Sequence, residues 1–400
     1  MAAATIPDFR APDFLLGEMR RIVAFYHPGC LNPAGGFFNT FNDDGSVGER
    51  EVQHLVSTAR FVINFAIGAR VLGRPELAAA AAHGLAALDR LHRDPVHGGF
   101  VWLLRGGVPE DATKHAYGHA FVLLACAEAM QSGLADAARL LAETFDVLER
   151  HFWSAGDGLY RDEFDAAFTA AAPYRGQNAN MHMTEALLAA YEATREARYL
   201  DRAALLARRI CVDLADAAGG LVWEHYHADW SVDWDYNRDN PQHLFRPYGY
   251  LPGHLVEWAK LLLWLESHRA EPWALPRARH FYATVLARAA DLAYGGLHYS
   301  FAPDGTLLDP DKYFWVMNEA CAAAAALAVR TGEEKFWQDY DRLWTYCWNH
   351  FIDHRHGGWY RLLAADGTRR ETIKSPPAKT DYHPFCACHS VLRLLREVAP

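Results

Sequence analysis

A two-residue motif recurs six times along this 400-residue chain and constrains its fold more than any other feature. In each copy a glycine precedes an apolar or aromatic residue, and the copies are Gly36-Phe37, Gly99-Phe100, Gly158-Leu159, Gly220-Leu221, Gly296-Leu297 and Gly358-Trp359. Successive copies lie 63, 59, 62, 76 and 62 residues apart. Intervals of this size exceed those of short solenoid repeats and suit a unit of two helices plus a loop.

The segments between these motifs are predicted to be helical. Immediately after a motif the pattern is strand-like, as in Gly99-Phe100-Val101-Trp102, which indicates a small hairpin. Farther along, the apolar period becomes about 3.6, as in the residues from Leu55 to Ile67. Twelve such stretches are expected, near residues 13–27, 51–72, 75–92, 115–131, 134–151, 181–194, 197–214, 251–268, 275–291, 314–331, 333–350 and 381–397. Twelve helices and six motifs make six helical hairpins.

The ends of this helical array suggest a closed ring. The first predicted helix lacks a partner before it and the last lacks one after it, so that pairing the two would complete the circle. We therefore expect an all-α, single-domain (α/α)6 barrel, or toroid, over residues 1–400, with short β-hairpin loops at one rim. An open superhelix of helix pairs would show the same local pattern. The alanine-rich helices after each motif are apolar nearly all round, which suits an inner ring.

Composition excludes several classes of protein. The net charge is -10 without an opposing basic cluster, which argues against a nucleic-acid partner. The longest apolar runs fall short of the roughly 20 residues that a bilayer span needs, and residues 1–12 lack the pattern of an export signal. Seven cysteines, an odd number, favour reduced buried thiols. We expect a cytoplasmic protein that binds no membrane and acts on a small neutral ligand.

The longest interval, of 76 residues, contains the most informative segment. Pro252-Gly253 places His254 in the first turn of an inner helix, and the i, i+3 spacing puts Glu257 on the same face, where a carboxylate can orient an imidazole. A His and a Glu that only cap and solvate the helix are the alternative. The sequence lacks the His-Glu-x-x-His motif of zinc proteases, and Cys386-Ala387-Cys388-His389 lacks a second cysteine pair, so no metal is expected.

Polar groups also begin other predicted inner helices. Tyr382-His383 opens the last one, Lys114-His115-Ala116-Tyr117 opens another, and His182 follows Asn178 in a third. Arg60 lies within an apolar helix, where a guanidinium needs either a core salt bridge or an anionic ligand. Such groups at five of the six predicted inner helices favour one shared site at a rim.

The chemistry of this site is narrowed by motifs that the sequence lacks. It contains no Ser-centred nucleophile elbow, phosphate-binding loop or dinucleotide glycine motif, so acyl transfer and nucleotide or nicotinamide chemistry lose support. Histidines with nearby arginines suit proton transfer beside a carbonyl, because a base removes the proton and a cation stabilises the enediolate.

Several segments resemble the N-acylglucosamine 2-epimerase superfamily. They are Arg246-Pro247-Tyr248-Gly249, Pro252-Gly253-His254-Leu255-Val256-Glu257-Trp258, Asn178-Ala179-Asn180-Met181-His182 and Tyr382-His383. The Asn178 segment and Asp239-Asn240-Pro241-Gln242-His243-Leu244-Phe245-Arg246 look most like the branch of mannose isomerases and sulfoquinovose isomerases. The resemblance covers nearly the whole chain. It implies the (α/α)6 fold, no metal or other cofactor, and interconversion of sugars at C1 and C2.

The resemblance also implies roles for nine residues. The acid/base histidines of the family fall on His254 and His383, and the substrate-binding positions fall on Arg60, Tyr117, Asn178, His182, Arg246, Glu257 and Trp315. In the implied mechanism a histidine opens the pyranose ring and the C2 proton is then removed to give a cis-enediolate. Arg60 and Arg246 would hold this intermediate, Glu257 would orient His254, and Trp315 would stack on the sugar.

The product depends on where the proton returns. Delivery to C1 yields the ketose, and delivery to the opposite face of C2 yields the epimer. Pro384-Phe385-Cys386 follow His383, where cellobiose 2-epimerases usually have Asn and a basic residue, so a disaccharide substrate is disfavoured. We expect an aldose-ketose isomerase that converts D-mannose to D-fructose, and also D-lyxose to D-xylulose. A sugar 2-epimerase is the nearest alternative, followed by an (α/α)6 glycoside hydrolase that uses Glu185, Glu257 or Glu319, and by a non-catalytic sugar-binding protein. The oligomeric state stays open.

Overall fold

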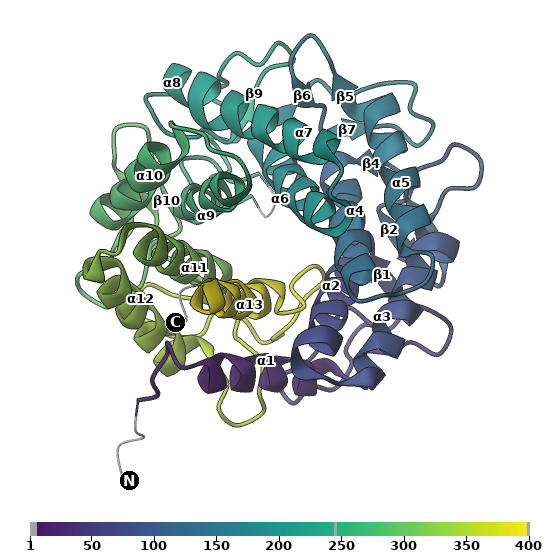
Figure 1. Ribbon diagram of the computed structural model, residues 1–400, viewed down its shortest axis with the longest axis horizontal. Helices are drawn as coiled ribbons and strands as arrows, with labels where there is room; N and C mark the ends of the chain where they lie inside the picture. The colour runs from purple at the N-terminus through teal and green to yellow at the C-terminus, as the bar shows by residue number, and fades with distance from the viewer. Residues whose placement is uncertain (1–5, 244–245, 398–400) are drawn as a thin grey trace.

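Six helices form the inner wall of a ring in the computed structural model, which describes residues 6–243 and 246–397 (Figure 1). Leu244 and Phe245 of the family-like segment lie outside the described residues. The inner helices are α2 (Leu55–Leu72), α4 (Ala116–Gln131), α6 (Gln177–Thr194), α9 (Pro252–His268), α11 (Phe314–Thr331) and α13 (Tyr382–Glu397). Each contacts the next, and α13 contacts α2, so the inner wall is continuous.

Six outer helices cover this wall. They are α1 (Pro12–Tyr26), α3 (Pro75–Ala87), α5 (Ala137–Val147), α7 (Ala197–Arg208), α10 (Ala274–Ala289) and α12 (Glu334–Tyr346). Four of them continue into π-helical turns, at Leu88–His92, Leu148–Phe152, Arg209–Leu214 and Cys347–Phe351, and the short α8 (Ala215–Ala217) follows the third turn. The first helix, α1, packs on the last, α13, and closes the ring. The predicted (α/α)6 fold is confirmed.

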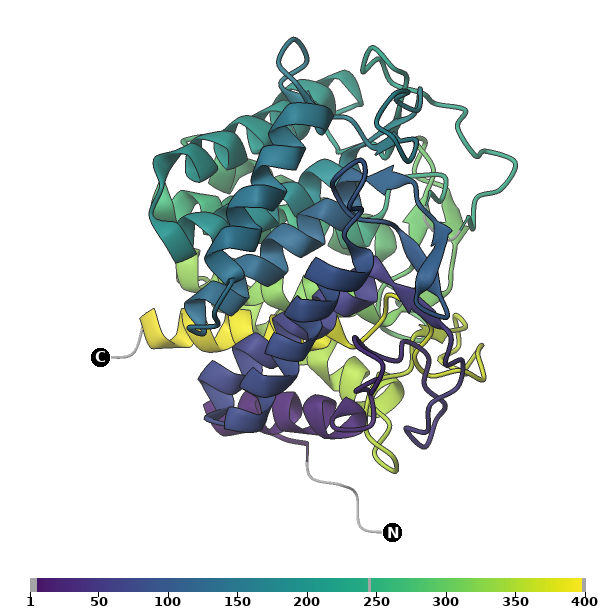
Figure 2. The ribbon, with the colours of Figure 1, turned by 90° about the vertical axis from the view of Figure 1, so that its right-hand side faces the viewer.

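Short strands gather at one rim, on the right in Figure 2, while the C-terminal end of α13 lies at the opposite end. They are β1 (Val52–His54), β2 (Leu103–Arg105), β3 (Val108–Asp111), β4 (Lys114–His115), β5 (Trp153–Ser154), β6 (Leu159–Tyr160), β7 (Glu163–Phe164), β8 (Arg175–Gly176), β9 (His225–Tyr226), β10 (Ser300–Phe301), β11 (Leu307–Asp309), β12 (Lys312–Tyr313) and β13 (Leu362–Leu363). All the strand pairs are antiparallel.

Backbone pairing fixes the start of every inner helix. Strands β1, β4, β8 and β12 each precede an inner helix and pair with a strand of the next unit, β2, β7, β9 and β13 respectively. Before α9 and α13 the same link is an isolated bridge, from Tyr250 to Phe301 and from Ser375 to Phe41. The first turns of all six inner helices are therefore held in register around one rim.

The predicted hairpins form at five of the six glycine motifs. Backbone bridges close the loops at Leu31–Phe37, Arg93–Phe100, Ala290–Leu297 and Ile352–Trp359, and β5 pairs with β6 at the third motif. At the fourth motif the part of the chain that the structure describes contains no such bridge, so the expected hairpin is absent there. The chain continues instead into the long interval that carries His254.

Two inner helices begin four residues away from their predicted starts. The predicted helix 181–194 begins at Gln177, so Asn178 is already helical. The predicted helix 51–72 begins at Leu55, because the residues before it pair with β2. Although α2 is long and apolar enough to cross a membrane, 78% of it is buried inside the protein, as befits an inner helix. All seven cysteines are free thiols, and six of them are buried.

Candidate active site

A cavity of about 330 Å³ opens at the rim where the inner helices begin. Eight of the nine residues that the sequence singles out line it, namely Arg60, Tyr117, Asn178, His182, His254, Glu257, Trp315 and His383. We call this space the rim cavity. Its side chains come from all six units, because each inner helix contributes its first turns to the same opening.

His254 lies in the first turn of α9, and its partner is Glu224. The His254 Nδ1 donates to Glu224 Oε2 at 2.9 Å. The Gln177 amide donates to the same carboxylate at 3.0 Å, and its carbonyl accepts from Trp258 Nε1 at 2.7 Å. The β8–β9 pair brings Gln177 beside Glu224. A carboxylate at Nδ1 favours the tautomer in which Nε2 of His254 can accept a proton.

The prediction that Glu257 orients His254 is therefore wrong. Glu257 lies on α9 as expected, but its carboxylate lies 3.8 Å from His182 Nδ1 on α6, while the imidazole of His254 bonds to Glu224 in the loop before β9. Helical spacing places two residues on one face, yet it does not determine which neighbouring unit each side chain contacts. Nothing in the sequence pattern points to Glu224 in this role.

His383 lies in the first turn of α13 and has a carboxylate partner on another helix. Its Nδ1 donates to Glu319 Oε1 of α11 at 2.7 Å, so its Nε2 is also left as a base. Burial lowers the pKa of His383 to about 4, although the Glu319 carboxylate partly opposes that shift. The imidazole is therefore neutral at pH 7.

Trp315 lies beside both histidines. Its ring centroid is 5.1 Å from that of His254 and 5.8 Å from that of His383. A glycine makes room for this indole, because a Cβ at Gly253 would lie 2.2 Å from Trp315 Cζ3. The Pro252-Gly253 pair thus starts α9 and also admits an aromatic platform between the two bases.

Arg60 projects from α2 into the rim cavity without a carboxylate of its own. Its guanidinium donates to Tyr117 Oη at 3.2 Å and to the Ala378 carbonyl, and it stacks over the Phe121 ring at 4.4 Å. Across residues 6–243 and 246–397 it forms no salt bridge, so the core ion pair weighed as an alternative is excluded for this part of the chain. A buried cation of this kind can bind a ligand that develops negative charge.

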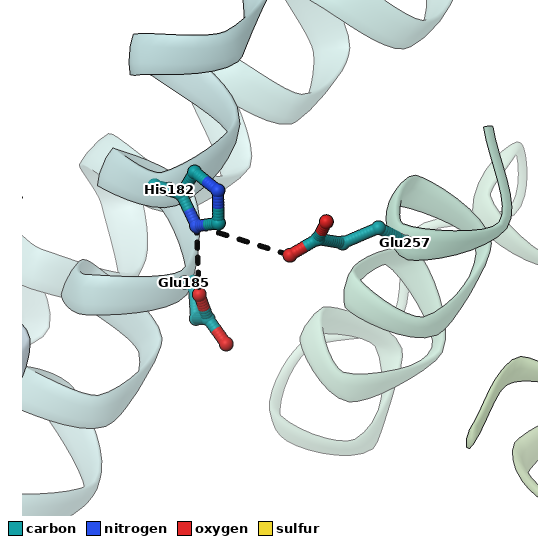
Figure 3. A group of neighbouring side chains, drawn as sticks. All are labelled: His182, Glu185 and Glu257. Atoms are coloured by element: carbon teal, nitrogen blue, oxygen red, sulfur yellow. Dashed lines mark hydrogen bonds and ion pairs between the residues drawn. The ribbon is translucent and has the colours of Figure 1, made fainter. Parts of the chain in front are cut away.

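His182, Glu185 and Glu257 form a buried group (Figure 3), of which His182 and Glu257 line the rim cavity. His182 Nδ1 donates to Glu185 Oε2 at 3.0 Å, and Glu257 Oε1 lies 3.8 Å from the same nitrogen. Neither oxygen of Glu257 has a hydrogen-bond partner among the described side chains. Burial, followed by the charge of Glu319, raises the pKa of Glu257 well above its ordinary value. This shift favours the protonated form of Glu257, in which the carboxyl group can donate a hydrogen bond.

Arg246 lies outside the rim cavity. It lines an adjoining cavity of about 190 Å³, and Tyr117 and Asn178 line both spaces. Its guanidinium donates to Glu163 Oε2 at 2.8 Å and covers the Tyr174 ring at 4.0 Å. The structure does not place Arg246 together with the other eight residues, because this pairing holds it at the side of the opening.

The backbone before His383 adopts conformations that are rare for residues other than glycine. Ala378, Thr380 and Asp381 have φ values of 69°, 47° and 48°, and such residues cost about 1–3 kcal/mol each. Side chains of α2 hold this segment, since Ser57 accepts from the Ala378 amide at 2.7 Å and Asn64 donates to the Thr380 carbonyl at 3.0 Å. The seam between the last unit and the first thus forms one wall of the rim cavity.

The sequence profile of N-acylglucosamine 2-epimerase (GlcNAc 2-epimerase) matches residues 36–387. The chain belongs to this epimerase family. A D-mannose isomerase of Marinomonas mediterranea is 48% identical over 390 residues, which cover 97% of this chain and 99% of that protein.

Two solved structures share the fold of this chain. A crystal structure of D-mannose isomerase superposes with a TM-score of 0.95 at 48% identity and covers 97% of this chain and 100% of that one. The cellobiose 2-epimerase of Bacillus thermoamylovorans superposes with a TM-score of 0.84 at 20% identity, over 96% of this chain and 100% of that one. The second likeness shows the shared fold alone.

Carboxylates and histidines of this family member also have the spacing of a metal site. Donor atoms of His182, Glu185 and Glu257 lie within 4.8 Å of one another, as do those of Glu257, Glu319 and His383. However, Lys260 Nζ lies among the same carboxylates and donates to Glu319 Oε2 at 2.5 Å. A divalent ion would meet this ammonium, so the donor set favours an ion-pair cluster over a metal.

Proposed function

We propose that this protein interconverts D-mannose and D-fructose by proton transfer between C2 and C1. One observation carries the proposal: two imidazoles, His254 and His383, face one cavity, each with Nδ1 bonded to a carboxylate and with no hydrogen bond to Nε2 from the residues that the structure describes. The 48% identity to a protein named D-mannose isomerase supports the choice of sugar.

The proposed reaction begins with opening of the pyranose ring, in which the O1 proton is removed and the ring oxygen is protonated. One imidazole Nε2 then takes the C2 proton, and the electron pair moves to give a cis-enediolate. Arg60 stabilises the oxyanion, because its guanidinium has no carboxylate to neutralise it within the described residues. Protonation at C1 and transfer of the O2 proton to O1 complete the ketose.

Other residues of the rim cavity suit an open-chain sugar. Glu257 donates a hydrogen bond from a neutral carboxyl group, and the buried Asn178 Oδ1 lacks a partner among the described residues and so can accept one. Trp315 offers an apolar face beside both bases. D-lyxose has the configuration of D-mannose at C2, C3 and C4, so we propose the same conversion of D-lyxose to D-xylulose.

The hydrolase alternative loses support from the placement of its carboxylates. Hydrolysis of a glycoside requires two carboxyl groups across the scissile bond. Glu185 and Glu319 are instead bonded to His182 and His383 behind the rim cavity, and only Glu257 of the three candidates lines it.

We further propose that residues 1–400 work as one catalytic domain in the cytoplasm, where seven free thiols stay reduced.

Proton NMR of the purified protein with D-mannose in deuterium oxide tests this function. Fructose that carries deuterium at C1 is the expected product, because the enediolate takes its new proton from exchangeable groups. Glucose with deuterium at C2 would identify a 2-epimerase instead. Unchanged D-mannose would contradict the proposal, and D-lyxose and disaccharides would then be assayed in the same way.

A further inference from the structure

One buried ammonium lies among three buried carboxyl groups directly behind the rim cavity. Lys260 Nζ is 2.5 Å from Glu319 Oε2, 3.9 Å from Glu185 Oε1 and 4.0 Å from Glu257 Oε1. Two of these carboxylates bond to histidines of the rim cavity, Glu319 to His383 and Glu185 to His182. Lys260 itself does not line that cavity. It therefore contacts the site only through its carboxylate partners.

Lys260 is reached from the other end of the ring. Together with Glu185 and Tyr382 it lines a second cavity of about 170 Å³, which we call the distal cavity. The space is many times larger than one water molecule requires, so the ammonium can be hydrated on that side. This hydration offsets part of the cost of burying the charge.

The charges of this cluster do not balance if every carboxyl group ionises. A single ammonium can neutralise one of the three carboxylates, and a second lies against His182. Glu257 has no hydrogen bond to either oxygen among the described residues, which suits the group that keeps its proton. The geometry thus assigns the ionised form to Glu319, whose two oxygens bond to Lys260 and His383.

We propose that Lys260 is a positioning residue that keeps Glu319 ionised and so holds His383 in the tautomer whose Nε2 is a base. A protonated Glu319 would donate to His383 Nδ1 and move the imidazole proton to Nε2, where it would block proton abstraction. The functional part of this inference rests on the proposed isomerase reaction. The tautomer of His383 can be measured without any substrate.

The ionisation of Glu319 agrees with this role. Burial alone would raise the pKa of Glu319, but the Lys260 charge and the hydrogen bond from His383 outweigh it and lower the pKa to about 2. Titratable and charged groups face the cluster from every packed helix. They are Arg60 on α2, Tyr117 on α4, His182 and Glu185 on α6, Glu257 on α9, and Tyr382, His383 and Cys386 on α13.

Nitrogen-15 NMR of histidine-labelled protein, without sugar, reads the tautomer directly. In the native protein we expect His383 to carry its proton on Nδ1 at pH 7. In Lys260→Met, removal of the cation raises the proton affinity of Glu319 and His383 together. His383 should then populate both the Nδ1-H and the Nε2-H tautomers, and the pair should bind its first proton at a pH about one unit or more higher than in the native protein. Lys260→Arg should restore the native pattern.

Kinetics give a second measurement. In Lys260→Met the acidic limb of kcat/KM should move to higher pH and kcat should fall about 10- to 100-fold, with little change in KM. Arg70→Met is the matched control, because it unpairs the buried Glu128 at the distal cavity and contacts neither histidine of the site. It should lower stability and leave the pH profile unchanged.

Two outcomes would overturn the proposal. One is a folded Lys260→Met protein with the native tautomer and titration of His383. The other is a shift of equal size in Arg70→Met. If Lys260→Met does not fold, the double variant Lys260→Met/Glu185→Gln keeps the net charge of the cluster, and comparison with Glu185→Gln alone isolates the ammonium. Failure of D-mannose turnover in the native protein would count against the proposed function but would leave the NMR result valid.

Discussion

His254 and His383 face the same cavity but are held by different kinds of structure. The partner of His254 is Glu224 in the loop before β9, and a neutral amide and an indole support that carboxylate. The partner of His383 is Glu319 within α11, and a buried ammonium supports it. Both arrangements place Nδ1 within 2.9 Å of a carboxylate oxygen.

The two histidines show that a carboxylate can orient an imidazole with or without a cation that keeps the carboxylate ionised. A loop carboxylate with neutral supports can orient an imidazole, and strand pairing between units is enough to position it. A carboxylate in the middle of a helical wall needs a cation to stay ionised, because burial disfavours its charge. We call His254 with Glu224 the first half of the site, and His383 with Glu319 and Lys260 the second half. The second half is therefore more sensitive to a change in charge than the first.

Removal of either imidazole should have the largest effect. His254→Ala and His383→Ala are each expected to lower kcat by about 10²- to 10⁴-fold, since a positioned acid or base contributes that much. Both side chains lie at the rim, so circular dichroism should show native helix content. Turnover close to native in both variants would refute their assignment as the acid/base pair.

Acid should destabilise the protein through the half that contains His383. The folded pKa of about 4 lies below the ordinary value of 6.5, so the unfolded state binds the proton more tightly. Stability attributable to His383 is complete above pH 6.5, declines as the pH falls, and stops declining near pH 4, with a total of about 3 kcal/mol.

Denaturant unfolding at pH 7 and pH 4.5 measures this effect. The difference between the two pH values should be smaller in His383→Gln than in the native protein. His97→Gln, at an exposed position, is the control and should behave as the native protein does. An equal difference in all three proteins would contradict the expected contribution of His383.

Neutral replacements of the two carboxylate partners compare the halves directly. Glu224→Gln and Glu319→Gln should each lower kcat about 10- to 100-fold, because the imidazole loses its anionic partner and its fixed orientation. Glu319→Gln should also lower the free energy of unfolding more, since it leaves the Lys260 ammonium without its bonded carboxylate. Equal stability of the two variants in urea unfolding would argue against this distinction.

The indole between the two histidines offers a milder perturbation. Gly253→Ala should displace Trp315, because the new Cβ would lie 2.2 Å from the ring, and we expect KM for the sugar to rise roughly tenfold. Gly17→Ala in α1 is the matched control, since nothing lies within 4 Å of its Cβ position. The control should keep native kinetics and gain about 1 kcal/mol of stability. Unchanged KM in Gly253→Ala would show that the position of Trp315 is unimportant.

Chelation should have no effect. Lys260 already occupies the space among Glu185, Glu257 and Glu319, so prolonged dialysis against EDTA is expected to leave activity unchanged. Inactivation that a divalent ion reverses would identify the cluster as a metal site. It would contradict the assignment of Lys260 as the cation that pairs with these carboxylates.

The repeat, the ring and the positions of His254 and His383 could be predicted from the sequence because their signals are local. Glycine spacing marks the units, and the residues that begin a helix are adjacent in the chain. The partners could not be predicted in the same way. Glu224 reaches His254 through strand pairing between units, and Glu319 reaches His383 across two helices. Arg246 bonds to Glu163, which belongs to a different unit, and this long-range contact could not be predicted either.

Because α1 packs on α13, the site can form only late in synthesis of the chain. A ribosome synthesises α1 and α2 before the helix that carries His383, so the ring cannot close until α13 has emerged. Until then α1 and α2 expose the apolar surfaces that α13 will cover, and Ser57 and Asn64 lack the strained segment that they will hold. A nascent chain that stops before residue 382 would thus be both inactive and prone to associate with other chains.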